Sequence, residues 1–231
     1  MHTIINGIIE AFRLLFFLDP ELMAIIALSL KVSIIAVLAA LMLGIPTGMA
    51  LSFSRFPGRR LLVAAINTGM GLPPVLAGLV VYLLFARSGP LGALQLIYTP
   101  TAIIIAQILI AYPVVTGLTM AALQSIEPGL RLQAMGLGAS PLQLWSLLLR
   151  ESRFSHLAAV MASFGAVVSE VGAVMIVGGD IRGETRVMTT AIVLETRMGN
   201  FERAIALGII LLAISFLVNL YLTLLQQKGK R

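Results

Sequence analysis

The 231-residue sequence contains no cysteine and carries little charge. Without cysteine there is no disulfide framework, no covalent haem attachment and no thiolate metal site. The two histidines, His2 and His156, lie far apart in the sequence and indicate no histidine-based metal site. Only 11% of the residues are charged and 59% are hydrophobic, whereas soluble domains have about 25% charged and about 45–50% apolar residues. The composition therefore predicts an integral membrane protein.

The sequence also lacks the motifs of an enzyme. It has no Gly-x-x-x-x-Gly-Lys-Ser/Thr loop to hold phosphates, no His-Glu-x-x-His, no nucleophile elbow and no paired carboxylates on one helix face. We expect no catalytic residue, no metal and no cofactor in this chain. The net charge of +6 does not indicate nucleic acid, because the basic residues stand mostly at the ends of apolar runs, where they set topology and meet anionic lipid.

Five apolar runs are long enough to cross a bilayer, which takes roughly 20 residues. They cover residues 23–53, 61–86, 100–124, 155–178 and 203–226. The sequence therefore predicts an all-α membrane protein with about five transmembrane helices. A further apolar piece, Val187 to Leu194, is too short to span. It predicts a short helix that either packs at the outer mouth or dips partly into the membrane, where protein or water must cover its backbone.

The N-terminal stretch 3–18 is amphipathic and too short to span comfortably, with Glu10 and Arg13 interrupting it. We expect an interfacial helix that lies on the membrane, with a sixth span as the alternative. The chain then divides into an N-terminal interfacial segment, residues 1–20, and one membrane domain, residues 21–231.

Lysine and arginine in short loops set the orientation of a membrane protein. One set of loops and the tail hold Arg55, Arg59, Arg60, Arg131, Arg150, Arg153, Lys228, Lys230 and Arg231. The loops on the opposite side also contain arginines, but the aspartates and glutamates among them reduce the net positive charge of that side. The distribution predicts a multi-pass protein of the cell membrane with the N-terminus outside and the C-terminus in the cytoplasm.

The stretch from Glu127 to Glu151 is polar and would face the cytoplasm in that orientation. Pro128 suits the first position of a helix, and glycines after it favour a helix end. Ser140-Pro141 restarts the chain, and Gln143 completes a capping box with Ser140. We predict two short helices joined by a glycine elbow, in a cytoplasmic loop of about 125–153.

The sequence LQAMGLGAS, residues 132–140, resembles the coupling loop of the membrane subunit of ABC importers, with Ala134 and Gly138 at the family's positions. Leu132 stands where the family has glutamate, so Glu127 or Glu151 is the candidate to brace the loop instead. Two other stretches, GLPPVLAGLVVYLL (residues 71–84) and the one beginning SEVGAVMIVGGDIRGE (residues 169–212), resemble tungstate-type permeases, relatives of molybdate and sulfate permeases.

The resemblance implies a type I ABC importer permease fold, acting as a homodimer with the pore on the two-fold axis. The implied partners are an ABC subunit, which binds ATP and Mg²⁺ on the cytoplasmic side, and an extracytoplasmic oxyanion-binding protein. The implied cargo is a small oxyanion, tungstate or molybdate. The residues implied to couple to the ATPase are Gln133, Ala134, Gly136, Gly138, Ala139 and Ser140.

Pore or gate candidates come from the interruptions of two spans. Pro73 and Pro74 must break or kink the second run, since proline cannot continue a helix ladder. Glu170, next to Ser169, lies inside the fourth run, where an acid normally faces a bundle interior or an aqueous path. For each, the alternative is structural: a kink fixed by packing, or an acid that accepts hydrogen bonds from a neighbouring helix or a freed backbone group.

The outer-mouth candidates are Arg182, Arg186, Thr189 and Thr190, which could meet an anion or seat a binding protein. The alternative is a solvated loop with internal ion pairs.

Three other functions stay open. These are a permease for sulfate or another small solute, a channel or secondary carrier that works without ATP, and a membrane anchor with no pore. The sequence does not select the oxyanion.

Overall fold

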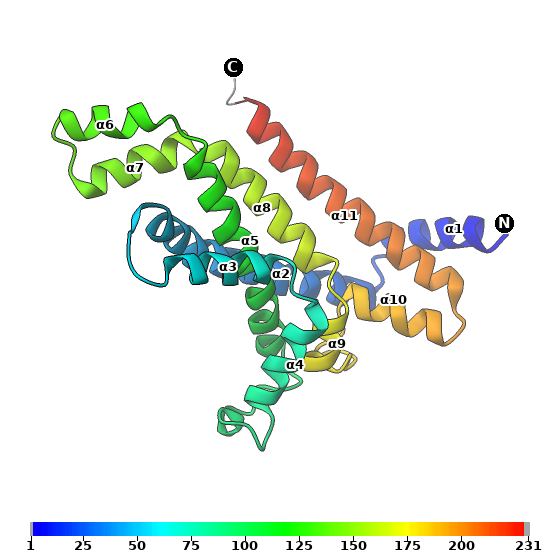
Figure 1. Cartoon of the computed structure of the whole chain (residues 1–231). Coiled ribbons are helices and arrows are strands. Elements are labelled where there is room, and N and C mark those ends of the chain that lie inside the picture. Colours follow the sequence, from blue (N-terminus) through cyan, green and yellow to red (C-terminus); the bar gives the residue numbers. More distant parts are fainter. Residues whose placement is uncertain (1, 229–231) are drawn as a thin grey trace.

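The computed structural model describes residues 2–228, and every regular element in that range is a helix (Figure 1). The helices are α1 (His2–Phe16), α2 (Pro20–Phe53), α3 (Arg59–Met70), α4 (Pro74–Phe85), the 3-10 helix η1 (Gly92–Leu94), α5 (Pro100–Gln124), α6 (Pro128–Gly136), α7 (Pro141–Glu151), α8 (Arg153–Val168), α9 (Gly172–Gly178), α10 (Met188–Arg197) and α11 (Phe201–Lys228). Lys230 and Arg231, which entered the prediction of orientation, lie outside the described residues.

Proline marks the start of many of these helices. α2, α4, α5, α6 and α7 each begin with proline in the first turn. Proline fits there because the N–H groups of the first turn have no hydrogen-bond partner within the helix, so the N–H that proline lacks is not missed. The residue before α2, Asp19, accepts a hydrogen bond from the backbone N–H of Leu22 at 2.9 Å. The starts of these helices are therefore determined by residues next to them in the sequence.

All five predicted runs form helical structure, but two of them are broken. α2, α5 and α11 are single helices that are long and apolar enough to cross a membrane. α3 and α4 form one bent pair with an angle of 108°, and α8 and α9 form another with an angle of 58°. The first break confirms the prediction at Pro73 and Pro74. The second falls at residues 169–171, where the sequence indicated an intramembrane acid but no break.

Helix α2 is the centre of the packing. It contributes buried residues to all four apolar clusters, for example Leu22, Val32, Val37 and Met49. α5 crosses α2 closely at Gly48: a methyl group added to Gly48 would lie only 2.8 Å from the backbone oxygen of Thr116 in α5. Small residues allow such close approach between membrane helices. α3, α4, α8 and α9 pack on this pair, whereas α11 packs mainly on α1, α10 and α8.

The short helices lie at the periphery. α1 packs along α11, where a methyl group on Gly7 would lie 2.6 Å from the side chain of Ile205. It has 15 residues, which is short for a span, so its place on the membrane surface stays a prediction. The short helix predicted at 187–194 is confirmed as α10, and its place at the outer mouth stays a prediction.

The two ends of the molecule differ in structure. α6 and α7 project at the end of the molecule where α11 ends, away from α10 and α1 (Figure 1). There the Gln226 side-chain amide of α11 donates to the Phe154 carbonyl of α8 at 3.1 Å. At the other end the start of α2 meets the loop after α9 through ion pairs.

Candidate functional site

The elbow between α6 and α7 has the geometry that the sequence predicted. The backbone N–H of Ala139 donates to Ala134, and that of Gly138 donates to Met135, each at 3.0 Å. This pair of bonds is a Schellman motif, which needs a left-handed residue after the helix. Gly138 supplies it with φ +81°. Gly136 is still helical, so Gly138 alone turns the chain.

The second helix of the elbow starts with the predicted capping box. Ser140 Oγ accepts from the Gln143 backbone N–H at 3.3 Å, and Gln143 Oε1 accepts from the Ser140 N–H at 2.8 Å. Both helix ends are thus closed by bonds within the elbow, which can hold its shape without long-range contacts.

The outer surface of the elbow is apolar and exposed. Leu137 is 89% exposed and Leu142 is 81% exposed, with Leu132 and Met135 beside them. Gln133 and Ser140 are also exposed, whereas Ala134 is buried. Exposed apolar residues gathered on a polar segment indicate a surface for a protein partner.

The elbow is braced by a cation rather than an acid. The Arg131 guanidinium lies 4.7 Å from the centroid of the Phe53 ring, at the end of α2, which is a cation–π contact. Among residues 2–228, Glu127 and Glu151 make no ion pair or side-chain hydrogen bond. The brace expected from one of these acids is therefore supplied by Arg131 instead.

The elbow is connected directly to a broken span. Only Ser152 separates α7 from α8, and its hydroxyl donates to the Leu148 carbonyl at 2.7 Å. Leu148 itself is buried against Met49 and Leu123. A displacement of the elbow would therefore reach α8 through a packed joint.

Glu170 lies at the break between α8 and α9. It is buried, and its Oε1 accepts from the backbone N–H of Ala173 at 2.8 Å, in the first turn of α9. The carboxylate thus satisfies a donor that the break sets free. This is the structural alternative that the sequence offered, a bond to a freed backbone group. Whether Glu170 also lines a pore stays a prediction.

Two other helices support the same break. Gln107 of α5 donates from Nε2 to the Val167 carbonyl at 3.2 Å, and Thr189 of α10 donates from Oγ1 to the Glu170 carbonyl at 2.8 Å. A small polar cavity of about 10 Å³ lies between them, lined also by Ser29 and Ser33. Broken backbone inside a membrane protein needs such partners, because no water or lipid replaces the lost bonds.

The two breaks lie side by side. A methyl group on α4 Gly78 would come within 2.6 Å of the Cα of α9 Ala173, and one on Gly172 would come within 2.7 Å of the side chain of Val75. The second halves of both broken spans, α4 and α9, are therefore in backbone contact. Pro73 and Ser169, at the two breaks, are exposed, and Pro74 is partly buried.

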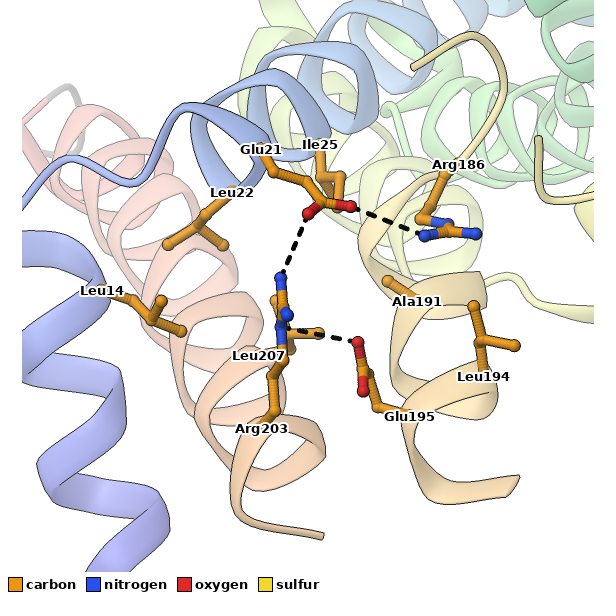
Figure 2. A pocket seen from close by; sticks show the side chains of 10 residues that line it. All are labelled: Leu14, Glu21, Leu22, Ile25, Arg186, Ala191, Leu194, Glu195, Arg203 and Leu207. Carbon is orange, nitrogen blue, oxygen red and sulfur yellow. Dashed lines mark hydrogen bonds and ion pairs between the residues drawn. The ribbon is translucent and has the colours of Figure 1, made fainter. Parts of the chain in front are cut away.

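The predicted outer-mouth arginines are engaged in ion pairs. Figure 2 shows Glu21 of α2 between Arg186 and Arg203. Arg182 also binds Glu21, with Nη2 at 2.7 Å from Oε2, and this bond raises the pKa of Arg182. Asp180 pairs with Arg186 at 3.2 Å, and Glu195 pairs with Arg203 at 3.4 Å. Three arginines and three acids make a neutral cluster.

The two outer-mouth threonines are buried. Besides Thr189 on the Glu170 carbonyl, Thr190 donates to the Val187 carbonyl at 3.0 Å and accepts from its N–H at 3.1 Å. In this conformation neither hydroxyl faces solvent. The role of the four outer-mouth residues toward an anion stays a prediction.

Sequence reasoning missed the partners that come from elsewhere in the chain. Glu21 and Arg203 had no local signal, because their pairing joins positions 182 residues apart. Gln107 did carry a signal in the sequence, because a buried amide in an otherwise apolar run must find a hydrogen-bond partner. Among residues 2–228 there is no group of three or more histidines or acids that could hold a metal ion.

Comparison with known proteins adds a family to this geometry. The family described as "Binding-protein-dependent transport system inner membrane component" matches residues 40–231. A tungstate uptake system permease protein of Peptoclostridium acidaminophilum is 43% identical over 99% of this chain and 100% of its own length. A probable anion ABC transporter permease protein of Haloferax volcanii is 43% identical over 86% of this chain and 88% of its own.

One solved structure has the same fold. The crystal structure of a bacterial ABC transporter that imports the acidic polysaccharide alginate matches with a TM-score of 0.79, covering 96% of this chain and 84% of that one. The sequence identity is 17%, so the likeness concerns the fold alone. It confirms the predicted type I importer architecture.

Proposed function

The chain belongs to the family of binding-protein-dependent transport system inner membrane components, and on this premise we propose that it is the permease subunit of an ATP-driven tungstate importer. It is a multi-pass membrane permease by family and by its apolar helices. The substrate, the partners, the orientation and the homodimer are the proposed part.

The choice of substrate rests on similarity along the whole chain. The relative named as a tungstate permease matches from end to end at 43% identity. Tungstate and molybdate are tetrahedral dianions of the same charge and nearly the same size, so we propose this pair as the cargo class. Sulfate is an outcome that the transport experiment tests.

The exposed elbow is the observation that carries the coupling to an ATPase. Its apolar tip around Leu137 has no partner within residues 2–228, and its shape is fixed by its own caps. A separate ATP-binding ABC subunit would cover this tip. ATP and Mg²⁺ would bind that subunit, and this chain would carry no catalytic residue.

The path from the elbow to the pore runs along α8. When the ATPases close, they would displace α6 and α7, and the joint at Ser152 would pass the motion to α8 and to the break at Glu170. Two copies of the chain, related by a two-fold axis, would open and close a pore between them by rigid-body rocking. The broken spans α3–α4 and α8–α9 would line it.

The proposed orientation rests on the distribution of basic residues among the loops. The basic residues around the elbow face the cytoplasm in this proposal, as does the end of α11. The N-terminus and α10 would then be outside, where a binding protein delivers the oxyanion. A reporter fused to the C-terminus that is active only outside the cell would contradict this assignment.

The proposal is tested by transport in membrane vesicles that contain this chain, its ATPase and its binding protein. We expect tungstate uptake that requires ATP and the binding protein. Leu137→Glu should abolish uptake and stimulation of the ATPase, because it places a charge on the apolar tip of the elbow.

Gln124→Glu is the matched control, since Gln124 is an exposed residue at the end of α5 outside the elbow tip. It adds the same charge and should leave uptake unchanged. Uptake without ATP would indicate a channel or carrier, and uptake of sulfate in preference to tungstate would replace the substrate.

A further inference from the structure

A second polar site lies at the outer end of α4. The chain leaves α4, folds back through η1 and enters α5, and it encloses an open pocket of about 590 Å³. The polar groups that line it are Tyr82, Arg87, Ser88, Gln95 and Tyr98. The sequence indicated no function here, since only Arg87 carries a charge in this loop.

The electrostatics of this pocket differ from those of the cluster at Glu21. Between Glu21 and Glu127 the chain has no aspartate or glutamate, and no acid lines the pocket. Arg87 makes no ion pair within residues 2–228. An arriving anion would therefore meet an unneutralised guanidinium at Arg87, whereas Arg182 and Arg186 already hold carboxylates.

The remaining groups of the pocket can donate hydrogen bonds. The hydrogen bond with the Tyr82 hydroxyl raises the pKa of Tyr98, and a tyrosine phenol is protonated at neutral pH even without such a shift. Gln95 and Tyr98 have φ values of +48° and +63°, in a left-handed region that few residues other than glycine adopt. Such backbone is retained where the surrounding structure requires it, often at binding sites.

The pocket is attached to the outer half of a broken span. The backbone N–H of Tyr98 donates to the Val177 carbonyl of α9 at 2.8 Å. The Tyr98 ring packs on Gly179, where a methyl group would lie 2.8 Å from the ring. Tyr98 thus contacts the C-terminal end of α9 directly, and the N-terminal end of the same helix is capped by Glu170. A ligand bound at Tyr98 could therefore affect α9.

We propose that this pocket is an entry site for the transported oxyanion, in which Arg87 supplies the charge and Ser88, Gln95 and Tyr98 supply hydrogen bonds to the tetrahedral oxygens. The inference rests on the proposed function for the identity of the ion. The pocket is far larger than the bare ion, so the ion keeps part of its water and binds weakly, as suits a site that must release it inward.

The test is tungstate binding to the full-length permease, purified without ATPase or binding protein, by equilibrium dialysis with elemental analysis. Arg87→Gln should weaken binding about tenfold, the effect of losing a charged hydrogen bond. Tyr98→Phe keeps the ring on Gly179 and should weaken binding about threefold. Arg197→Gln, an exposed outer arginine in no ion pair within residues 2–228, is the matched control and should bind as the wild type does.

Three outcomes would overturn the inference: no binding to the wild-type permease, equal binding by wild type and Arg87→Gln, or equal losses in Arg87→Gln and Arg197→Gln. A further arm measures the affinity of the binding protein for each variant. If Arg87→Gln weakens only that complex, the pocket receives a carboxylate of the partner and the inference is wrong.

Transport separates this inference from the proposed function. Wild-type vesicles that import tungstate while Arg87→Gln binds the ion normally would refute the pocket alone. Wild-type vesicles that import no tungstate would refute the proposed function.

Discussion

The two ends of this molecule are stabilised in different ways. The turn of the elbow is held by bonds between residues three to five positions apart, such as Ser140 with Gln143 and Ala139 with Ala134. The opposite end, around Glu21, is held by bonds between distant segments, such as Glu21 with Arg182, which are 161 positions apart. An element with local bonds can move as a unit without losing them. An element with distant bonds must break them to move.

The largest difference in stability should appear between two glycine-to-alanine variants, one at the contact of α4 with α9 and one in the elbow. Gly78→Ala would press against the Cα of Ala173, and we expect a loss of about 2–3 kcal/mol of stability from overpacking. Gly136→Ala adds the same group where nothing lies within 4 Å, and it should be neutral or slightly stabilising, because alanine favours a helix. Thermal unfolding of the purified chain in detergent measures both. Equal losses would show that the α4–α9 contact is no tighter than the elbow.

The next effect concerns Glu170 at the second break. Glu170→Ala removes the acceptor for the Ala173 N–H and should cost about 1–3 kcal/mol, because a buried donor is left unpaired. Glu170→Gln keeps an oxygen at this place and should unfold close to the wild-type temperature.

The same pair of variants separates the two roles of this residue. If Glu170→Gln is folded and imports tungstate at the wild-type rate, the carboxylate is a cap and the pore assignment is wrong. Reduced uptake with unchanged stability would support a place on the path.

Ser140→Ala should have a smaller and more local effect. Loss of an N-cap costs about 1 kcal/mol, and here it should open the first turn of α7 without unfolding the spans. Hydrogen exchange of the amides at 143 and 144 should accelerate about fivefold, with the thermal midpoint unchanged. A lower midpoint would mean that the elbow unfolds together with the membrane domain, and it would contradict the view that local bonds hold the elbow independently.

The smallest effect is expected from the exposed arginine of the outer cluster. The Arg182 side chain is 72% exposed, and ion pairs in water contribute little, so Arg182→Gln should leave the thermal midpoint unchanged. Arg186→Gln should lower it, because that side chain is only 16% exposed and its loss leaves Asp180 without its partner. Raising the salt concentration should not remove this difference, since buried pairs are screened weakly.

Features held by local bonds could be predicted from the sequence. The elbow, its caps and its glycine turn were all predicted, because serine, proline and glycine act on the residues beside them. The five spans were predicted from runs of apolar residues. The 108° break followed from Pro73 and Pro74, since proline acts on its own helix.

The break at Ser169–Val171 was not predicted, because no proline causes it. Besides the local bond from the Ala173 N–H to Glu170, it is held by two side chains from other helices, Gln107 of α5 and Thr189 of α10. The brace of the elbow by Arg131 was missed for a similar reason, since Phe53 lies 78 positions earlier. Pairings between distant segments depend on the packing of the whole bundle, which local patterns do not encode.

The central place of α2 has a consequence for biogenesis. α2 is the first long apolar helix to leave the ribosome, but the partner of its outer end, α11, is made last. Leu22 and Ile25 can meet Ala11 of α1 early, but they gain their α11 neighbours only when nearly the whole chain has been made. A nascent chain cut before Phe201 would therefore lack the α11 residues Ala206, Leu207 and Ile210, which complete the apolar cluster at the start of α2.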